Sequence, residues 1–110
     1  MLIYKIVARA EWMASAGDYD GSAQDKADGF LHFSTAAQLA ETLRLYYADA
    51  DDLMLVAATA EACMGLKWEH SASRGQDFPH LYGPLTCDAM KWARPITRKA
   101  DGAFVLPDLD

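Results

Sequence analysis

The sequence predicts an α+β fold: a small domain in which several short strands form a mixed sheet beside one main helix. Most of its apolar runs are short and bounded by turn residues, which is typical of strands. Only one segment combines a helix start signal with apolar residues at helical spacing. With 110 residues the chain is long enough for one hydrophobic core and too short for two, so we expect a single domain, residues 1–110.

The first third of the chain predicts two strands with a short helix and a polar loop between them. Leu2–Val7 alternates weakly as a strand, and Ala8–Ser15 is a candidate short helix that ends before Gly17. The stretch 18–29 is rich in Asp, Gly and Ser, which is typical of a loop. In 30–34, "FLHFS", the period of a strand places alternate side chains on opposite faces.

The main helix is predicted for residues 36–48. Thr35 followed by Gln38 forms a capping-box pattern at its start. Leu39 and Leu43 recur behind this pattern at helical spacing.

The remaining elements are predicted as strands and turns. "LMLVAAT" at 53–59 is typical of a central buried strand, "LKWE" at 66–69 of a shorter one, and "MKWARPIT" at 90–97 is also strand-like. A turn at 100–103 precedes a last apolar segment at 104–107.

Composition narrows the classes of partner. The chain is 52% hydrophobic and 24% charged, as folded globular proteins are. Its net charge of −6 gives no general attraction to phosphate backbones, so we expect no nucleic acid as a partner. No apolar run approaches the roughly 18 residues that suggest a membrane span, so we also expect no membrane partner.

The N-terminus and the cysteines predict a cytoplasmic protein. "MLIYKIVARAEW" lacks the basic segment and long apolar core of a signal peptide. Cys63 and Cys87 fit neither a disulfide framework nor a C-x-x-C motif, and we expect both to be buried as small hydrophobic side chains.

A first candidate site lies in "DGFLHFST", residues 28–35. Phe30, His32 and Ser34 share one face of the predicted strand, which leads directly into the N-terminus of the main helix. Free backbone N–H groups and the helix dipole favour an anion there, and a histidine at this position is suited to a ribose hydroxyl. In the alternative interpretation His32 is a half-buried structural residue, and Ser34 and Thr35 only cap the helix.

A second candidate cluster lies in "KWEHSASRGQDFPHLYG". Glu69 ends a strand and is a candidate general base or a ligand for a hydroxyl, and Arg74 on the following loop is a candidate for binding an anion. His80 and Tyr82 alternate onto one face, where a tyrosine ring can stack on a flat ligand. The alternatives are a solvated loop charge and a turn held by aromatic packing. We expect these four side chains to converge on the pocket that holds His32.

A metal site is a weaker hypothesis. It would use His32, His70 and His80 with Glu69, but no short histidine or cysteine spacing typical of metal ligands connects them. We therefore predict no metal ligands.

The segments "GFLHFSTAAQLAETL", "KWEHSASRG" and "FPHLYGPL", with "IYKI" near the start, resemble a small bacterial family known as domain of unknown function 952. The resemblance extends over most of the chain. It implies a fold grouped with the ADP-ribosyltransferases and similar to the NAD-dependent RNA 2′-phosphotransferases. In that superfamily an H-x-S or H-x-T triplet binds NAD, which implies that His32 contacts the ribose and Ser34 lies near the nicotinamide.

The sequence departs from that superfamily in two places. Phe33 stands where some members have a glycine, and no glutamate follows Tyr82, although the transferases commonly carry a late one. Glu69 would replace it only by a different route through the fold.

The functional prediction has two forms. In the first, the domain binds NAD or a nucleotide-like ligand and acts as a transferase, with His32 and Glu69 as catalytic residues and Ser34, Arg74, His80 and Tyr82 binding the cofactor. In the alternative, the same pocket belongs to a non-catalytic binding or regulatory module.

Overall fold

The computed structural model describes residues 1–109, which form two antiparallel sheets and three short α-helices. The four-stranded sheet has the order β1-β3-β6-β7, and the three-stranded sheet has the order β2-β5-β4. The strands are β1 (Leu2–Ala8), β2 (Leu31–His32), β3 (Leu53–Thr59), β4 (Leu66–Ser71), β5 (Gln76–Leu81), β6 (Met90–Arg98) and β7 (Phe104–Val105). The helices are α1 (Arg9–Ala14), α2 (Ala23–Asp28) and α3 (Leu39–Tyr46), with 3-10 turns at Ala36–Gln38 and Ala60–Ala62.

The α+β class is confirmed, but the expectation of a mixed sheet is wrong for the described residues. All five strand pairings between 1 and 109 are antiparallel. Sequential strands such as β4 and β5 are joined by a tight turn, which reverses the chain and imposes antiparallel pairing.

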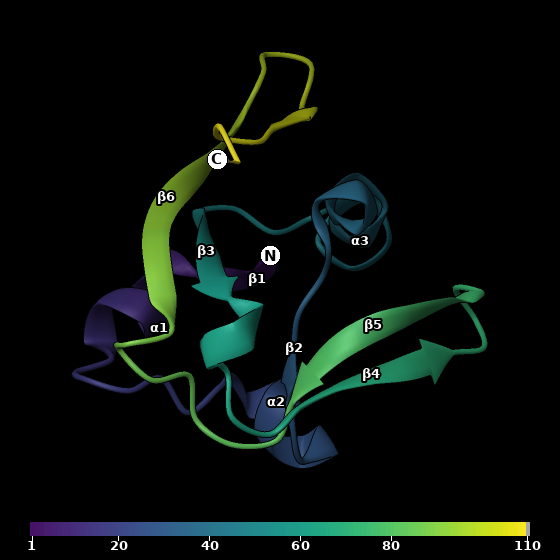
Figure 1. The fold of residues 1–110 in the computed structure, drawn as a ribbon. Helices are drawn as coiled ribbons and strands as arrows, with labels where there is room; N and C mark the ends of the chain where they lie inside the picture. The colour runs from purple at the N-terminus through teal and green to yellow at the C-terminus, as the bar shows by residue number, and fades with distance from the viewer. Residues whose placement is uncertain (110) are drawn as a thin grey trace.

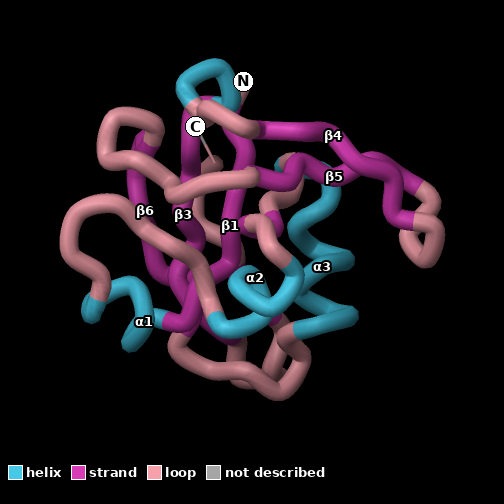
Figure 2. The backbone as a smooth tube through the Cα atoms, turned by 90° about the horizontal axis from the view of Figure 1, so that it is seen from below, coloured by secondary structure: helices cyan, strands magenta, loops and turns pink. Residues whose placement is uncertain are grey.

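Within residues 1–109, one backbone pair connects the two sheets. The N–H of Tyr4 in β1 donates to the carbonyl of Ser34 at 2.8 Å, and the N–H of Ser34 donates to the carbonyl of Tyr4 at 2.7 Å. Figure 1 shows the β4–β5 hairpin projecting from the four-stranded sheet with α3 beside it, and Figure 2 shows β1, β3 and β6 side by side. The segment after β2 therefore lies where the two sheets meet.

The strand β3 forms the centre of the core. It has the bounds predicted from "LMLVAAT", and its first six residues are all buried. Alternate side chains enter two different apolar clusters: Val56 and Ala58 pack in one, while Leu55 and Ala57 pack in the other. Both faces of β3 are covered, which explains its continuous apolar sequence.

The prediction of a loop at 18–29 is wrong for residues 23–28, which form the helix α2 although most of them are polar. The side chain of Ser22 accepts from the N–H of Asp25 at 3.2 Å, and the Asp25 carboxylate accepts from the N–H of Ser22 at 2.9 Å, so the two residues form a capping box for α2. Gly29 ends the helix with a φ of +86°, a conformation that favours glycine.

Two further predicted elements are shorter in the structure. The strand expected at 30–34 is confined to Leu31–His32, because Ser34 pairs with β1 instead of continuing along β5. The helix expected at 36–48 begins as a 3-10 turn and becomes α3 only at Leu39. The capping contact itself is present, since Gln38 accepts from the N–H of Thr35 at 2.9 Å.

The cysteine prediction is half correct. Cys63 is buried in the core, but Cys87 is exposed in the segment before β6. Of the helices within residues 1–109, none is long and apolar enough to cross a membrane.

Candidate functional site

A cleft of about 530 Å³ opens between α2, the β2 segment (β2 and the two residues after it, 31–34), α3 and the β4–β5 hairpin. His32 and Ser34 line it from the β2 segment, Thr42 from α3, and His80 from β5. Its volume lies in the range of small-molecule sites, about 300–1,000 Å³.

The inner wall of the cleft contains a buried chain of charges that ends on His32. Nζ of Lys5 lies 2.7 Å from Oδ2 of Asp25, and Oδ1 of the same carboxylate lies 2.7 Å from Nδ1 of His32. Lys5 and Asp25 are 4% and 3% exposed, whereas the side chain of His32 is 39% exposed. The ring of His32 is therefore held from inside the protein and presented to the cleft.

Asp25 is ionised in this arrangement. Burial alone would raise its pKa, but the hydrogen bond from His32 and the charge and hydrogen bond of Lys5 lower it well below its ordinary value. The carboxylate also accepts from the backbone N–H groups of Ser22 and His32. For the Lys5 amine, burial has the opposite direction and lowers the pKa, and the negative charge of Asp25 opposes this effect.

A second histidine stands opposite His32 on the sheet. His32 and His80 are directly paired in the β2–β5 register, and their ring centroids lie 5.6 Å apart. Phe30 contacts both rings, with centroid distances of 4.6 Å to His32 and 4.2 Å to His80. The two imidazoles and the phenyl ring form one aromatic cluster.

His80 has its own carboxylate partner. Nδ1 of His80 lies 2.8 Å from Oε1 of Glu69, and the hydroxyl of Tyr82 donates to the same oxygen at 2.7 Å. The hydrogen bonds from Tyr82 and His80 lower the pKa of Glu69, and the bond to Glu69 raises the pKa of Tyr82. An ionised carboxylate only accepts, so Nδ1 of His80 donates to Glu69.

Arg74 supplies a cation to the outer part of the cleft. Its Nη1 donates to Oγ1 of Thr42 at 3.1 Å, and its guanidinium lies over the ring of Phe78 at 4.6 Å. Its Nη2 is buried and has no hydrogen-bond partner among residues 1–109. Buried donors are normally satisfied, so this nitrogen is available to an acceptor.

Ser34 is more structural than the sequence suggested. The residue is 5% exposed, its backbone connects the two sheets, and its Oγ lies 3.4 Å from Oγ1 of Thr42. It still lines the cleft, but its hydroxyl faces Thr42, to which Arg74 also donates.

The structure brings most of the candidate residues together. His32, Ser34, Arg74 and His80 line the cleft. Glu69 and Tyr82 are not among the lining residues and reach the cleft only through His80. Tyr82 packs against Phe30 at a centroid distance of 5.2 Å.

Sequence reasoning missed Lys5 and Asp25. A signal for each was present: Lys5 interrupts the apolar strand "LIYKIV", where a buried lysine requires a partner, and Ser22 with Asp25 has capping-box spacing. The pairing itself depends on the 19 residues between them folding back, which no local pattern predicts.

The proposed metal grouping does not form. Within residues 1–109, no three or more His, Cys, Asp or Glu side chains are placed to share a metal ion.

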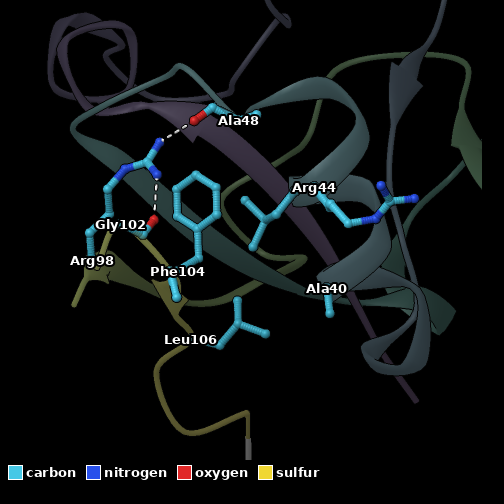
Figure 3. A pocket seen from close by; sticks show the side chains of 9 residues that line it. Ala40, Arg44, Ala48, Arg98, Gly102, Phe104 and Leu106 are labelled. Carbon is cyan, nitrogen blue, oxygen red and sulfur yellow. Dashed lines mark hydrogen bonds between the residues drawn. The ribbon is translucent and has the colours of Figure 1, made fainter. Parts of the chain in front are cut away.

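A second hollow, of about 340 Å³, lies between α3 and the C-terminal segment. Figure 3 shows Arg98 beside Phe104 with its guanidinium bonded to the carbonyls of Ala48 and Gly102, while Arg44 extends away from Phe104. Nη1 and Nη2 of Arg98 donate to backbone carbonyls, and its Nε lies 3.2 Å from Oδ1 of Asp51 but has no hydrogen-bond partner among residues 1–109.

The comparisons with known proteins support a family assignment. No curated protein matches the chain. The chain is similar to the crystal structure of protein CC0527 from Caulobacter crescentus, with 42% identity, a TM-score of 0.86, and coverage of 96% of this chain and 94% of that one. The solution structure of CC0527 gives 43% identity and a TM-score of 0.79 over 92% and 89% of the two chains. The model of a family of proteins of unknown function matches residues 6–93, and the chain therefore belongs to that family, DUF952.

Proposed function

We propose that the chain is a cytoplasmic small-molecule-binding domain whose cleft accepts NAD or a smaller nucleotide-like ligand. The observation that carries the proposal is the buried Nη2 of Arg74, which has no partner among residues 1–109 and belongs to a side chain lining the cleft. A phosphate oxygen would satisfy this nitrogen, and arginine is suited to phosphate because of its fork of donors.

The other walls of the cleft support a ligand with rings and hydroxyls. Phe33 and Phe78 supply apolar surface, and Tyr46, which is 63% exposed, lies 5.9 Å from the Arg74 guanidinium. A base would stack on exposed Tyr46 while its phosphate binds Arg74. Ribose hydroxyls would reach His32, as the resemblance to the ADP-ribosyltransferases implies.

The contacts favour binding over ADP-ribosyl transfer. Glu69 is the carboxylate that the sequence suggests for such a reaction, but its Oε1 is already bonded to His80 and Tyr82. It is not among the lining residues of the cleft. In this proposal the resemblance to the transferases therefore supplies only the class of ligand. The domain binds that ligand without transferring ADP-ribose.

The test is a titration of the purified protein with NAD, ADP-ribose, AMP and adenosine, monitored by thermal shift and calorimetry. A ligand that binds the native state raises the melting temperature. We expect the phosphate-bearing ligands to bind more tightly than adenosine. We expect Arg74→Ala to weaken them by about 10-fold or more, because a charged hydrogen bond contributes about 1.5–3 kcal/mol.

The matched control is Arg44→Ala. Arg44 lies on α3, pairs with Glu41, and is not among the residues that line the cleft. Equal affinity for AMP and adenosine, or equal losses in the two arginine variants, would contradict the proposal.

A further inference from the structure

The strand β4 (Leu66–Ser71) leaves one edge of the protein open to pairing with another strand. It is the outer strand of the sheet β2-β5-β4, and Figure 1 shows the β4–β5 hairpin projecting from the rest of the fold. Within residues 1–109, no backbone hydrogen bond reaches β4 from outside the hairpin. An open edge of this length is a template for a further strand.

The other sheet edges are protected. The strands β2 and β7 have only two residues each, and five of the seven residues of β1 are buried. Beyond its short pairing with β7, the outer side of β6 carries Pro95, which has no N–H to donate. The strand β4 has six residues and no proline, so it differs from all of them.

The backbone groups that face the open edge belong to alternate residues of β4. The carbonyl of Gly65 accepts the N–H of Tyr82 at 3.0 Å, so it points toward the β5 side of the hairpin. The N–H of Leu66 lies across the same planar peptide and points the opposite way. Because the direction alternates along a strand, Trp68 and His70 also present their N–H and C=O groups to the open edge.

Exposed apolar side chains gather at the same edge. Trp68, in the middle of β4, is 45% exposed, and Met64, two residues before the strand, is 88% exposed. A second strand paired with β4 would cover part of this surface.

The charges of β4 are complementary to those of a second copy of the same strand. When two copies pair antiparallel about a two-fold axis at Trp68, Lys67 stands opposite the partner's Glu69, and Glu69 stands opposite the partner's Lys67. A shift of the axis by one residue in either direction would place Lys67 opposite the partner's Lys67, or Glu69 opposite the partner's Glu69. Opposite charges in cross-strand pairs stabilise a sheet and like charges destabilise it, so one register is selected.

We propose that two copies of the chain associate through antiparallel pairing of their β4 strands about a two-fold axis at Trp68, which joins the two three-stranded sheets into one. Leu66, Trp68 and His70 exchange backbone hydrogen bonds with the partner, and the two Trp68 rings meet beside the axis. The interface is isologous, because each copy offers the same surface. This inference does not depend on the proposed nucleotide binding.

The partner also contributes a charge next to the candidate site. Oε1 of Glu69 is bonded to His80 and Tyr82, whereas Oε2 has no hydrogen-bond partner among residues 1–109. The partner's Lys67 reaches this carboxylate in the proposed register. Association therefore adds a cation to the group that holds His80 against the cleft.

The association is weak because one strand pair is a small interface. Stable interfaces bury at least about 1,200 Å² in total, and transient ones bury less. We therefore expect a dimer that dissociates on dilution, and the experiment is sedimentation equilibrium over protein concentrations from about 10 μM to 1 mM. Low ionic strength preserves the contribution of the exposed charges.

Charge reversal tests the register. Lys67→Glu and Glu69→Lys should each weaken the dimer by about 10-fold or more, because two cross-strand pairs change from attraction to repulsion. An equimolar mixture of the two single variants should associate like the parent, since each copy then faces the opposite charge. The double variant should also associate like the parent.

The matched control is Lys91→Glu. Lys91 is exposed on β6, and its reversal changes the net charge as much as Lys67→Glu does. This variant should associate like the parent. Circular dichroism checks that each variant is folded.

Amide hydrogen exchange of the parent protein, followed by NMR, needs no variant. The N–H groups of Leu66, Trp68 and His70 should exchange more slowly as the protein concentration rises. Those of Lys67 and Glu69 face β5 within the hairpin, so their exchange should change little.

Each outcome decides the proposal. A parent protein that stays monomeric at about 1 mM overturns it and leaves the β4 edge to an extended segment of a different protein. Association that survives both single charge reversals, or that the mixture of the two does not restore, overturns the register at Trp68. If Glu69→Lys proves unfolded, Lys67→Glu and the exchange pattern of the parent still test it.

Discussion

Replacing Asp25 by asparagine tests the buried ion pair that supports the cleft. The substitution keeps the size of the side chain but leaves the Lys5 ammonium, 4% exposed, without a counter-charge. Removing one partner of a buried pair typically costs about 3–5 kcal/mol of the free energy of unfolding, because a charge remains uncompensated. Small domains have only about 5–15 kcal/mol in total.

The magnitude is supported by the number of contacts at risk. The Asp25 carboxylate lies 2.7 Å from both Lys5 Nζ and His32 Nδ1, and it accepts the N–H of Ser22 at 2.9 Å. An asparagine retains one acceptor oxygen, but its amide N–H₂ would face either the Lys5 ammonium or the ring N–H of His32, and two donors cannot form a hydrogen bond with each other. The resulting loss corresponds to a fall in melting temperature of more than about 10 °C in a domain of this size.

Urea denaturation at neutral pH is the assay, and Asp77→Asn is the matched control. Asp77 also pairs with a histidine, His70, at 3.0 Å, but its side chain is 60% exposed. Exposed pairs contribute about 0–1 kcal/mol, so the control should unfold almost like the parent. Similar losses in both variants, each below about 1 kcal/mol, would refute the reasoning that Lys5 and Asp25 are both charged in the folded state.

Three further predictions follow from the same contacts. The pKa of Asp25 is lower in the folded state than in the unfolded state, where it is roughly 4, so the carboxylate stabilises the fold above that pH and loses this effect as the pH falls toward the folded-state pKa. Urea curves of the parent and Asp25→Asn should therefore stay apart between about pH 5 and 7 and converge as the pH falls below about 4. His32→Ala should cost about 1–3 kcal/mol in the same assay, more than a typical surface change, because Asp25 loses a charged hydrogen bond; a loss within about 0.5 kcal/mol would contradict this. A thiol reagent should label Cys87 in the native protein and Cys63 only after unfolding, since burial shields Cys63 and raises the pKa of its thiol; mass spectrometry of the labelled peptides would expose the opposite order.

Local patterns in the sequence predicted the elements that local physics determines. The strand at 53–59 is readable because both its faces are buried, and the start of the main helix because Thr35 and Gln38 form a contact within three residues. The helix α2 was missed because its residues are polar, although its capping box was visible. The antiparallel arrangement depends on how distant strands pair, which a single sequence does not specify.

The site was predictable in its parts and not in its connections. His32 and His80 were both candidates, but their direct pairing across β2 and β5 is a matter of register. The carboxylate of Asp25 reaches His32 only because α2 folds against β2 and presents its inner face. No local pattern in either of the two segments that form such a contact predicts that they come together.

The buried charges of Lys5 and Asp25 are better explained by the site than by stability. A buried ion pair is often no more stabilising than apolar residues of similar volume, since desolvation offsets the attraction. The position of this pair, between the strand β1 and the ring of His32, gives it a different consequence. With both carboxylate oxygens engaged from below, Asp25 holds the imidazole in one tautomer and one orientation toward the cleft. An apolar pair would fill the same space but would leave Nδ1 of His32 without its carboxylate partner, so the charges contribute chiefly to the geometry of the site.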